Sequence, residues 1–238
     1  MSYANNPYAA PSYTFAAQAA ADERAGFIAK TYAHLAGAIA AFIAIEAVLL
    51  TMPGIENLVG LMIGTRYGWL VVLGLFMAVS WIADGWARTA ISPAKQYWGL
   101  GLYVVAEAVI FVPLLFIAQR VDTSIIPLAG FTTLVLFGVL TAIVMITRKD
   151  FSFLRTILIF GGFAAMGLIV VSILFGFALG PIFTYAMIAF ACGYILYDTS
   201  NVLHHYRIGQ HIAAALALFA AVALLFWYIM RLFLSSRR

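Results

Sequence analysis

Three carboxylic acids stand inside long apolar runs of this sequence: Glu46, Glu107 and Asp198. Acids inside membrane-spanning segments are costly, and they usually face a bundle interior, a water-filled cavity or a proton or ion path. A carboxylate can take up a proton, and calcium prefers several oxygen ligands of this kind. The three acids therefore indicate a possible route for protons or calcium ions.

Asp198 belongs to a polar stripe on an otherwise apolar segment. Tyr194, Asp198, Asn201 and His205 follow one another at i, i+4, i+7 and i+11, so they share one face of a helix. Such a stripe can hydrogen-bond to a neighbouring helix or line a wet cavity. Two interpretations stay open at this point: Asp198 titrates and acts as a gate, or it is a bonded polar residue that only locks helix packing.

A calcium site would draw on several of these groups. Asp198 and Glu107 are the candidate metal ligands, and Asn201 could add a further oxygen. Pro113 lies within an apolar run, where it should kink its helix and free the backbone carbonyl of Val109. No zinc motif accompanies them, because there is no HExxH and the single cysteine is isolated.

The composition indicates the surroundings of these acids. The chain has 238 residues, of which 65% are hydrophobic and only 9% are charged. Soluble domains carry roughly 25% charged residues, so a soluble fold of this chain would lack polar side chains to cover its surface. We expect an integral membrane protein in a lipid bilayer, and nothing in the net charge of +4 suggests a nucleic-acid partner.

Seven segments are long and apolar enough to cross a bilayer as helices, which takes about 20 residues each. We therefore predict an all-α protein with a flexible polar tail over residues 1–26 and a seven-helix membrane domain over residues 27–238. The predicted spans are Thr31–Leu50, Gly68–Ala83, Trp98–Ala118, Ile125–Ile146, Ile157–Leu179, Ile182–Leu203 and Ile212–Leu234.

Basic residues predict the orientation, because Lys and Arg favour cytoplasmic loops. Most of them, including Arg88, Arg148 and Lys149, fall on the side of the N-terminus, which is therefore predicted to be cytoplasmic. Seven spans place Arg237 and Arg238 on the opposite side, against this rule. Either the C-terminus tolerates this position, or the last apolar segment re-enters the membrane and returns.

Several catalytic classes are excluded. All three lysines lie in tails or loops, so no Schiff base to retinal can form within the membrane. Tyr197-Asp198 is typical of the first half of an intramembrane aspartyl protease site, but a second mid-membrane aspartate is missing. We find no phosphate-binding loop and no nucleophile elbow. We therefore expect no enzyme and no cofactor.

Two motifs resemble those of the Bax inhibitor-1 family. The loop Thr147-Arg148-Lys149-Asp150-Phe151-Ser152-Phe153-Leu154 resembles one family signature, and the run Gly193–Asn201, with Tyr197 and Asp198, resembles its sixth-helix motif. The resemblance extends over residues 27–235. Weaker matches are Thr31-Tyr32, Ala215-Leu216-Ala217-Leu218-Phe219 and Arg231-Leu232. The two main motifs look most like those of the bacterial YccA branch.

The resemblance implies a seven-helix bundle with the last helix at its centre. It also implies one of two activities in the inner (plasma) membrane. The YccA branch is associated with the membrane-anchored protease FtsH, which it modulates; branch similarity favours this activity. Other members behave as pH-sensitive calcium leak channels, in which a carboxylate pair between helices six and seven closes the pore.

The chain departs from the channel pattern in the seventh segment. The family's second aspartate aligns with Ala221, the following asparagine aligns with Leu224, and no acid occurs from Ile212 to Leu234. The two-carboxylate latch therefore cannot form here. Asp198 is left as a solitary acid. We expect its nearest polar neighbours to be Asn201 and Tyr194 on its own helix, or Glu107 across the bundle.

Overall fold

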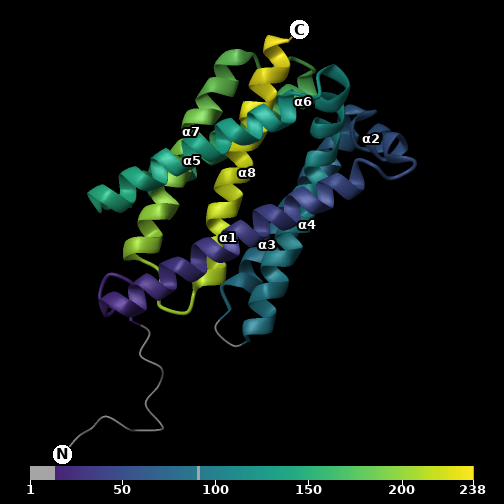
Figure 1. Ribbon diagram of the computed structural model, residues 1–238. Helices are drawn as coiled ribbons and strands as arrows, with labels where there is room; N and C mark the ends of the chain where they lie inside the picture. Colours follow the sequence, from purple (N-terminus) through teal and green to yellow (C-terminus); the bar gives the residue numbers. More distant parts are fainter. Residues whose placement is uncertain (1–13, 90–91, 238) are drawn as a thin grey trace, which may run out of the picture.

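The computed structural model describes residues 14–89 and 92–237, which fold into helices joined by short loops (Figure 1). Seven of these helices are long and apolar enough to cross a membrane, as predicted. The helices are α1 (Ala21–Leu49), α2 (Ile55–Ile63), α3 (Arg66–Ala87), α4 (Pro93–Val121), α5 (Ile125–Thr147), α6 (Leu154–Phe175), α7 (Pro181–His204) and α8 (His211–Ser236).

Helix α8 lies at the centre of the bundle and packs against α1, α3, α4, α5 and α7 (Figure 1). Its sequence is almost entirely apolar. Small residues such as Ala213, Ala214 and Ala215 let the neighbouring helix backbones approach closely, and these three alanines are fully buried. The central position of the last helix, which the family resemblance implied, is confirmed.

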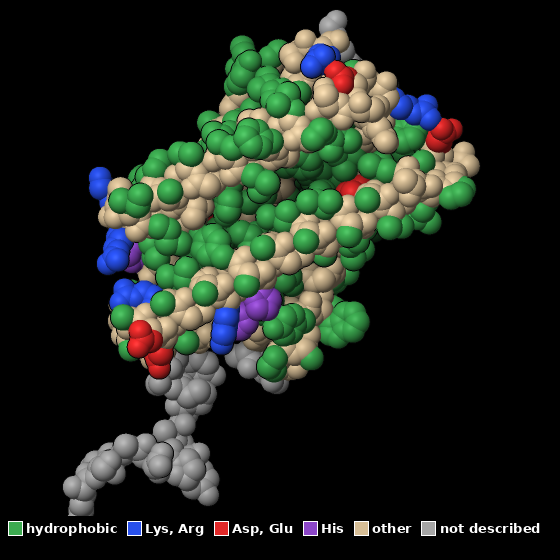
Figure 2. Space-filling view, viewed as in Figure 1, with side chains coloured by type: hydrophobic (Ala, Val, Ile, Leu, Met, Phe, Trp, Pro, Cys, Tyr) green, Lys and Arg blue, Asp and Glu red, His purple; other side chains and the backbone are tan. Residues whose placement is uncertain are grey.

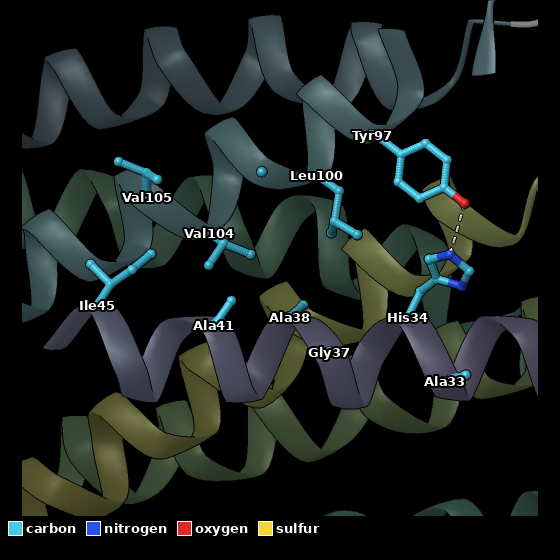
Figure 3. Close-up of a pocket in the computed structure, with 11 residues that line it drawn as sticks. Ala33, His34, Gly37, Ala38, Ala41, Ile45, Tyr97, Leu100, Val104 and Val105 are labelled. Atoms are coloured by element: carbon cyan, nitrogen blue, oxygen red, sulfur yellow. Dashed lines mark hydrogen bonds between the residues drawn. The ribbon is translucent and has the colours of Figure 1, made fainter. Parts of the chain in front are cut away.

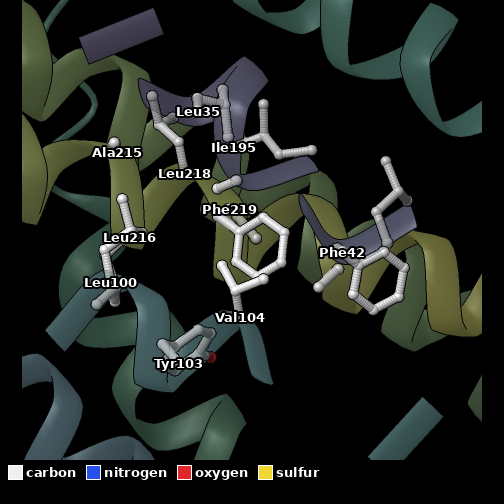
Figure 4. Close-up of a cluster of buried hydrophobic side chains, with 14 of the residues drawn as sticks. Leu35, Phe42, Leu100, Tyr103, Val104, Ile195, Ala215, Leu216, Leu218 and Phe219 are labelled. Atoms are coloured by element: carbon white, nitrogen blue, oxygen red, sulfur yellow. The ribbon is translucent and has the colours of Figure 1, made fainter. Parts of the chain in front are cut away.

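The core is built where α1, α4, α7 and α8 meet (Figure 4). The ring of Phe42 from α1 stands edge-on to Phe111 of α4, with 5.2 Å between centroids, and to Phe219 of α8, with 6.1 Å. Edge-to-face contacts of this kind are favoured between aromatic rings. They tie the first helix to the centre of the bundle.

The helix ends follow the sequence signals. Pro93 and Pro181 stand at the first positions of α4 and α7, where the missing N–H costs no hydrogen bond. Gly176 follows the last residue of α6 in the left-handed region at φ 75°, which is why this helix ends before the predicted Leu179. Helix α4 runs unbroken past Pro113.

The structure differs from the predicted segments mainly near the N-terminus and before α3. Helix α1 begins at Ala21 rather than Thr31, so the part of the predicted tail that the structure describes is largely helical or packed. Residues 1–13 lie outside the described residues. Helix α2 was not predicted, because its nine residues are too few to span a bilayer.

Helix α8 continues without a break from His211 to Ser236, so the alternative of a re-entrant last segment is wrong. The start of α1 and the end of α8 therefore lie at opposite ends of the bundle (Figure 1). At the C-terminal end Arg237 Nη1 lies 2.8 Å from Asp122 Oδ2, and Arg120 pairs with Glu56. These acids neutralise arginines that the orientation rule would place in the cytoplasm. The cytoplasmic N-terminus stays a prediction.

Candidate functional site

Asp198 lies buried in the last third of α7, with 8% of its surface exposed. Two neighbours stabilise its carboxylate: Asn201 hydrogen-bonds to it, and Arg88 attracts it electrostatically. Arg88 follows the last residue of α3, so a charge from another helix compensates the acid. A solitary buried carboxylate is costly, and Arg88 lowers that cost.

Arg88 has a direct partner in Asp84, one turn earlier in α3. Its Nε lies 2.8 Å from Oδ1 and 2.7 Å from Oδ2 of that carboxylate. Both side chains are partly exposed, at 51% and 39%. One guanidinium therefore serves two acids: it contacts Asp84 directly, and it acts on the more deeply buried Asp198 through space.

Tyr206, in the loop between α7 and α8, completes this group. Burial raises the pKa of its phenol, the nearby Asp198 raises it further, and Arg88 opposes these effects. The phenol stays neutral beside the charged residues. We call Asp84, Arg88, Asp198, Asn201 and Tyr206 the polar cluster.

The segment before α1 is tied to the loop that carries Tyr206. The backbone N–H of Ala16 donates to the Tyr206 carbonyl at 2.9 Å, and the N–H of Ile208 donates to the Thr14 carbonyl at 3.0 Å. The guanidinium of Arg207 lies over the Phe15 ring, 5.5 Å from its centroid. We call residues 14–20 the N-terminal strap; it fixes one wall of the polar cluster.

The loop between α5 and α6 docks onto the C-terminal end of α7. The N–H of Phe151 donates to Ser200 Oγ at 2.9 Å, and His205 Nε2 lies 3.0 Å from Asp150 Oδ2. A ring nitrogen of His204 is 3.2 Å from the Arg148 carbonyl. The two sequence motifs that carry the family resemblance thus form one structural unit.

Asp150 is held as a carboxylate by this loop. Slight burial raises its pKa, but hydrogen bonds from Ser152 and the contact with His205 outweigh that effect, so the pKa lies below its usual range. The Ser152 N–H donates to Oδ1 at 2.8 Å. Arg148 ends α5 with a φ of 51°, a left-handed conformation that the docked loop stabilises.

The other two predicted acids lie elsewhere in the bundle. Glu107 is buried in α4 beside the Tyr103 hydroxyl, one turn away. Glu46 is buried in α1 near its C-terminal end. Among residues 14–89 and 92–237, no three His, Cys, Asp or Glu side chains come close enough together to hold a metal ion. Calcium binding by Asp198 and Glu107 stays a prediction.

Sequence reasoning missed Asp84, Arg88 and Tyr206 as partners of Asp198. From the sequence, Arg88 is expected only as a loop charge that sets orientation. The i, i+4 spacing of Asp84 and Arg88 was visible and predicts their ion pair. Their proximity to Asp198 was not visible, because it depends on how α3 packs near α7.

A groove of about 450 Å³ runs between α1 and α4 (Figure 3). Its walls are apolar except at one end, where His34 Nε2 lies 3.1 Å from the Tyr97 hydroxyl. The His34 ring also contacts His211, with centroids 4.9 Å apart. The His34 ring and the Tyr97 hydroxyl therefore already satisfy each other.

Six membrane-length helices around a central seventh, with a charge-compensated acid near one end, define a polytopic α-helical membrane protein. Comparison with family profiles places it more narrowly. Residues 24–238 match the profile described as "Inhibitor of apoptosis-promoting Bax1", and the chain belongs to this Bax inhibitor-1 family.

A curated relative is similar over part of its length. The chain is 34% identical over 103 residues to an uncharacterized protein, PA2604, of Pseudomonas aeruginosa. The matched stretch covers 43% of this chain and 46% of that protein, so it spans about half of the relative. No solved structure matches the chain.

Proposed function

We propose that the protein is a pH-responsive cation leak pathway whose closed state is held by attraction between Arg88 and Asp198. One observation carries the proposal: a buried carboxylate in the family's sixth-helix motif is compensated by a guanidinium from another helix. This pair takes the role of the two-carboxylate latch, whose second acid position is occupied by buried Ala221.

Protonation of Asp198 would open the pathway in the following way. A neutral Asp198 no longer attracts Arg88, while Asp84 still holds the guanidinium at 2.7–2.8 Å. Arg88 then stays with α3, and the end of α7 loses an electrostatic tie to it. The polar cluster loosens, and water and cations gain access to the bundle interior.

Two further acids mark a route through the bundle. Asp198 lies near one end of α7, Glu107 lies near the middle of α4, and Glu46 lies one turn from the far end of α1. Because these helices cross the membrane, the acids occupy different depths. Calcium ions or protons could pass between them, with Asn201 and Tyr194 beside the first.

Flux through the full-length protein in liposomes tests this proposal. The liposomes carry a calcium-sensitive or pH-sensitive dye, and flux is measured from pH 5 to pH 8. Asp198→Asn removes the titrating charge, so we expect flux that no longer depends on pH. Asp122→Asn, at the opposite end of the bundle, is the matched control and should keep the wild-type profile. Wild-type pH dependence in Asp198→Asn would contradict the mechanism.

A second candidate is the modulation of an FtsH-type membrane protease. Its support is the N-terminal strap: the hydrogen bonds of Thr14 and Ala16 anchor the chain beside Tyr206, and residues 1–13 precede this anchor. A membrane-anchored protease on the predicted cytoplasmic side could engage such a segment. Co-purification of the full chain and of a chain lacking residues 1–13 with the host protease tests it. Absence of any association, together with unchanged protease output on deletion of the gene, would count against it.

A further inference from the structure

A cavity of about 400 Å³ lies among α1, α4, α5 and α8, away from the polar cluster. Figure 2 shows a hollow between α1 and α5, with hydrophobic side chains around it and an acidic group at its floor. Small-molecule sites typically have about 300–1,000 Å³ and are mostly apolar with a few polar groups. The cavity fits that description.

Glu46 is the one acid among the lining residues, and no side chain in the described part of the chain pairs with it. Only 4% of its surface is exposed, and neither carboxyl oxygen takes part in a hydrogen bond with any residue of 14–89 or 92–237. The hydroxyl of Thr133, also in the lining, is occupied because it donates to the Ala129 carbonyl at 2.8 Å. An unpaired buried carboxyl costs several kcal/mol in an apolar setting (about 2–7 for a neutral polar group). A ligand that supplied donors here would remove this cost.

The cavity opens toward the lipid. Ile43 and Leu134, on facing helices at its rim, are 60% and 51% exposed. Glu46 lies one turn before the end of α1, close to the membrane boundary, and the apolar part of the cavity extends from there along Phe42, Phe219 and Phe226. An occupant would therefore enter from the bilayer, with its polar end at Glu46.

We propose that this cavity binds an amphipathic amine, with its ammonium group on Glu46 and its apolar body among the phenylalanine rings. This inference goes beyond the leak pathway and does not depend on it. The ammonium group offers three N–H donors and the opposite charge, so it satisfies both carboxyl oxygens at once. The rings of Phe42 and Phe226 stand perpendicular, 6.5 Å apart, and offer ring faces to a cation or an apolar chain.

Other occupants fit the lining less well. A long-chain alcohol donates a single hydrogen bond and leaves the second oxygen of Glu46 unpaired. A fatty acid brings a second carboxyl group. A calcium ion needs six or more oxygen ligands, whereas the lining offers one carboxyl group and the Thr133 hydroxyl.

Thermal stabilisation of the full-length protein in phosphatidylcholine nanodiscs tests the proposal, because a ligand that binds only the folded state raises the Tm. The probes are dodecylamine and dodecanol, which share one alkyl chain. We expect dodecylamine to give the same Tm shift as dodecanol at roughly one tenth of the concentration, which corresponds to about 1.4 kcal/mol. Glu46→Gln should abolish this difference, and Glu107→Gln, another buried acid outside the cavity, should keep it.

Two glycines of α5 provide a matched pair that leaves Glu46 intact. A Cβ at Gly130, which lines the cavity, or at Gly138, which does not, meets no atom within 4 Å. Gly130→Leu should therefore fill the cavity and weaken the Tm shift of dodecylamine at least tenfold, whereas Gly138→Leu should leave it unchanged. Equal effects of the two variants would overturn the assignment.

A photoreactive dodecylamine provides a measurement that needs no variant. In the wild-type protein we expect cross-links on the lining residues of α1 and α5, and competition by dodecylamine at roughly one tenth of the concentration that dodecanol needs. Equal potency of amine and alcohol, or an unchanged response in Glu46→Gln, would mean that the cavity binds the alkyl chain and does not recognise the ammonium group. Either result would overturn the proposal.

Discussion

The contact between Phe151 and Ser200 gives the sharpest test of how the two family motifs work together. Ser200 is fully buried in α7, and its Oγ accepts the Phe151 N–H at 2.9 Å. Its further contacts, with Asp150 Oδ1 at 3.4 Å and the Lys149 carbonyl at 3.5 Å, are long and weak. Ser200→Ala removes the acceptor and leaves the Phe151 N–H without its partner.

The cost follows from that one donor. A fully buried donor that is left unsatisfied costs about 1–3 kcal/mol, and this range is an upper bound for the part-buried Phe151 N–H. For a protein of this length 1 kcal/mol shifts the Tm by about 2–4 °C. We therefore expect Ser200→Ala to lower the Tm by several degrees, and by no more than about 12 °C. Ser235→Ala is the matched control, because its exposed Oγ donates to Leu232 within its own helix at 2.8 Å. A surface change of this kind should stay within about 0.5 kcal/mol.

The measurement is thermal unfolding of the full-length protein in detergent, followed by tryptophan fluorescence. A double-mutant cycle with Asp150→Asn adds a second reading, since coupled residues deviate from additivity by about 0.5–3 kcal/mol. A Tm change for Ser200→Ala no larger than that of Ser235→Ala would refute the conclusion that docking of the loop stabilises α7. Strict additivity with Asp150→Asn would separate Asp150 from the same unit.

Three further outcomes are expected. Arg88→Gln should raise calcium flux into dye-loaded liposomes at neutral pH, because the attraction that holds Asp198 is lost. Arg155→Gln is the control and should leave the flux unchanged; equal flux in the two variants would argue against a role of Arg88 in the closed state. Deletion of residues 1–20 removes the Thr14 carbonyl, which accepts a hydrogen bond from the Ile208 N–H at 3.0 Å. Hydrogen exchange of the Ile208 N–H should therefore accelerate; unchanged exchange would show that the N-terminal strap does not protect the loop between α7 and α8. The pKa of Asp150 lies below its unfolded value of about 3.9, so its stabilisation is complete above that pH and is lost as the pH falls further. Between pH 7 and pH 3 the Tm of the wild type should therefore fall more than that of Asp150→Asn, and parallel curves would contradict this.

The bundle was predictable because a bilayer imposes strong rules on sequence. Each crossing needs about 20 apolar residues, and Pro93 and Pro181 mark two helix starts directly. Helix α2 could not be predicted in this way, because its nine residues are too few to give the length signal of a membrane span. The early start of α1 was not predicted, because the charged residues Asp22 and Glu23 in its first turn resemble part of a polar tail. Acids are nevertheless favoured at a helix N-terminus.

The site was predictable only in part. Asp198 and Asn201 stand three residues apart on one helix, so their hydrogen bond follows from local geometry. Arg88 stands far from Asp198 in the sequence, and no local pattern shows which charged loop residue comes close to a given acid. The docking of Phe151 on Ser200 is likewise non-local. Contacts of this kind are decided by helix packing.

The exchange of a second acid for a cation has a consequence for the pH response. Two neighbouring carboxylates share a proton and titrate as a coupled pair with two macroscopic steps. Asp198 instead interacts with Arg88, which stays charged over the whole physiological range. If this pair holds the pathway closed, a single proton opens it, and flux should rise along a one-proton titration curve. A curve that requires two cooperative protons would mean that an acid outside the polar cluster takes part in closing the pathway.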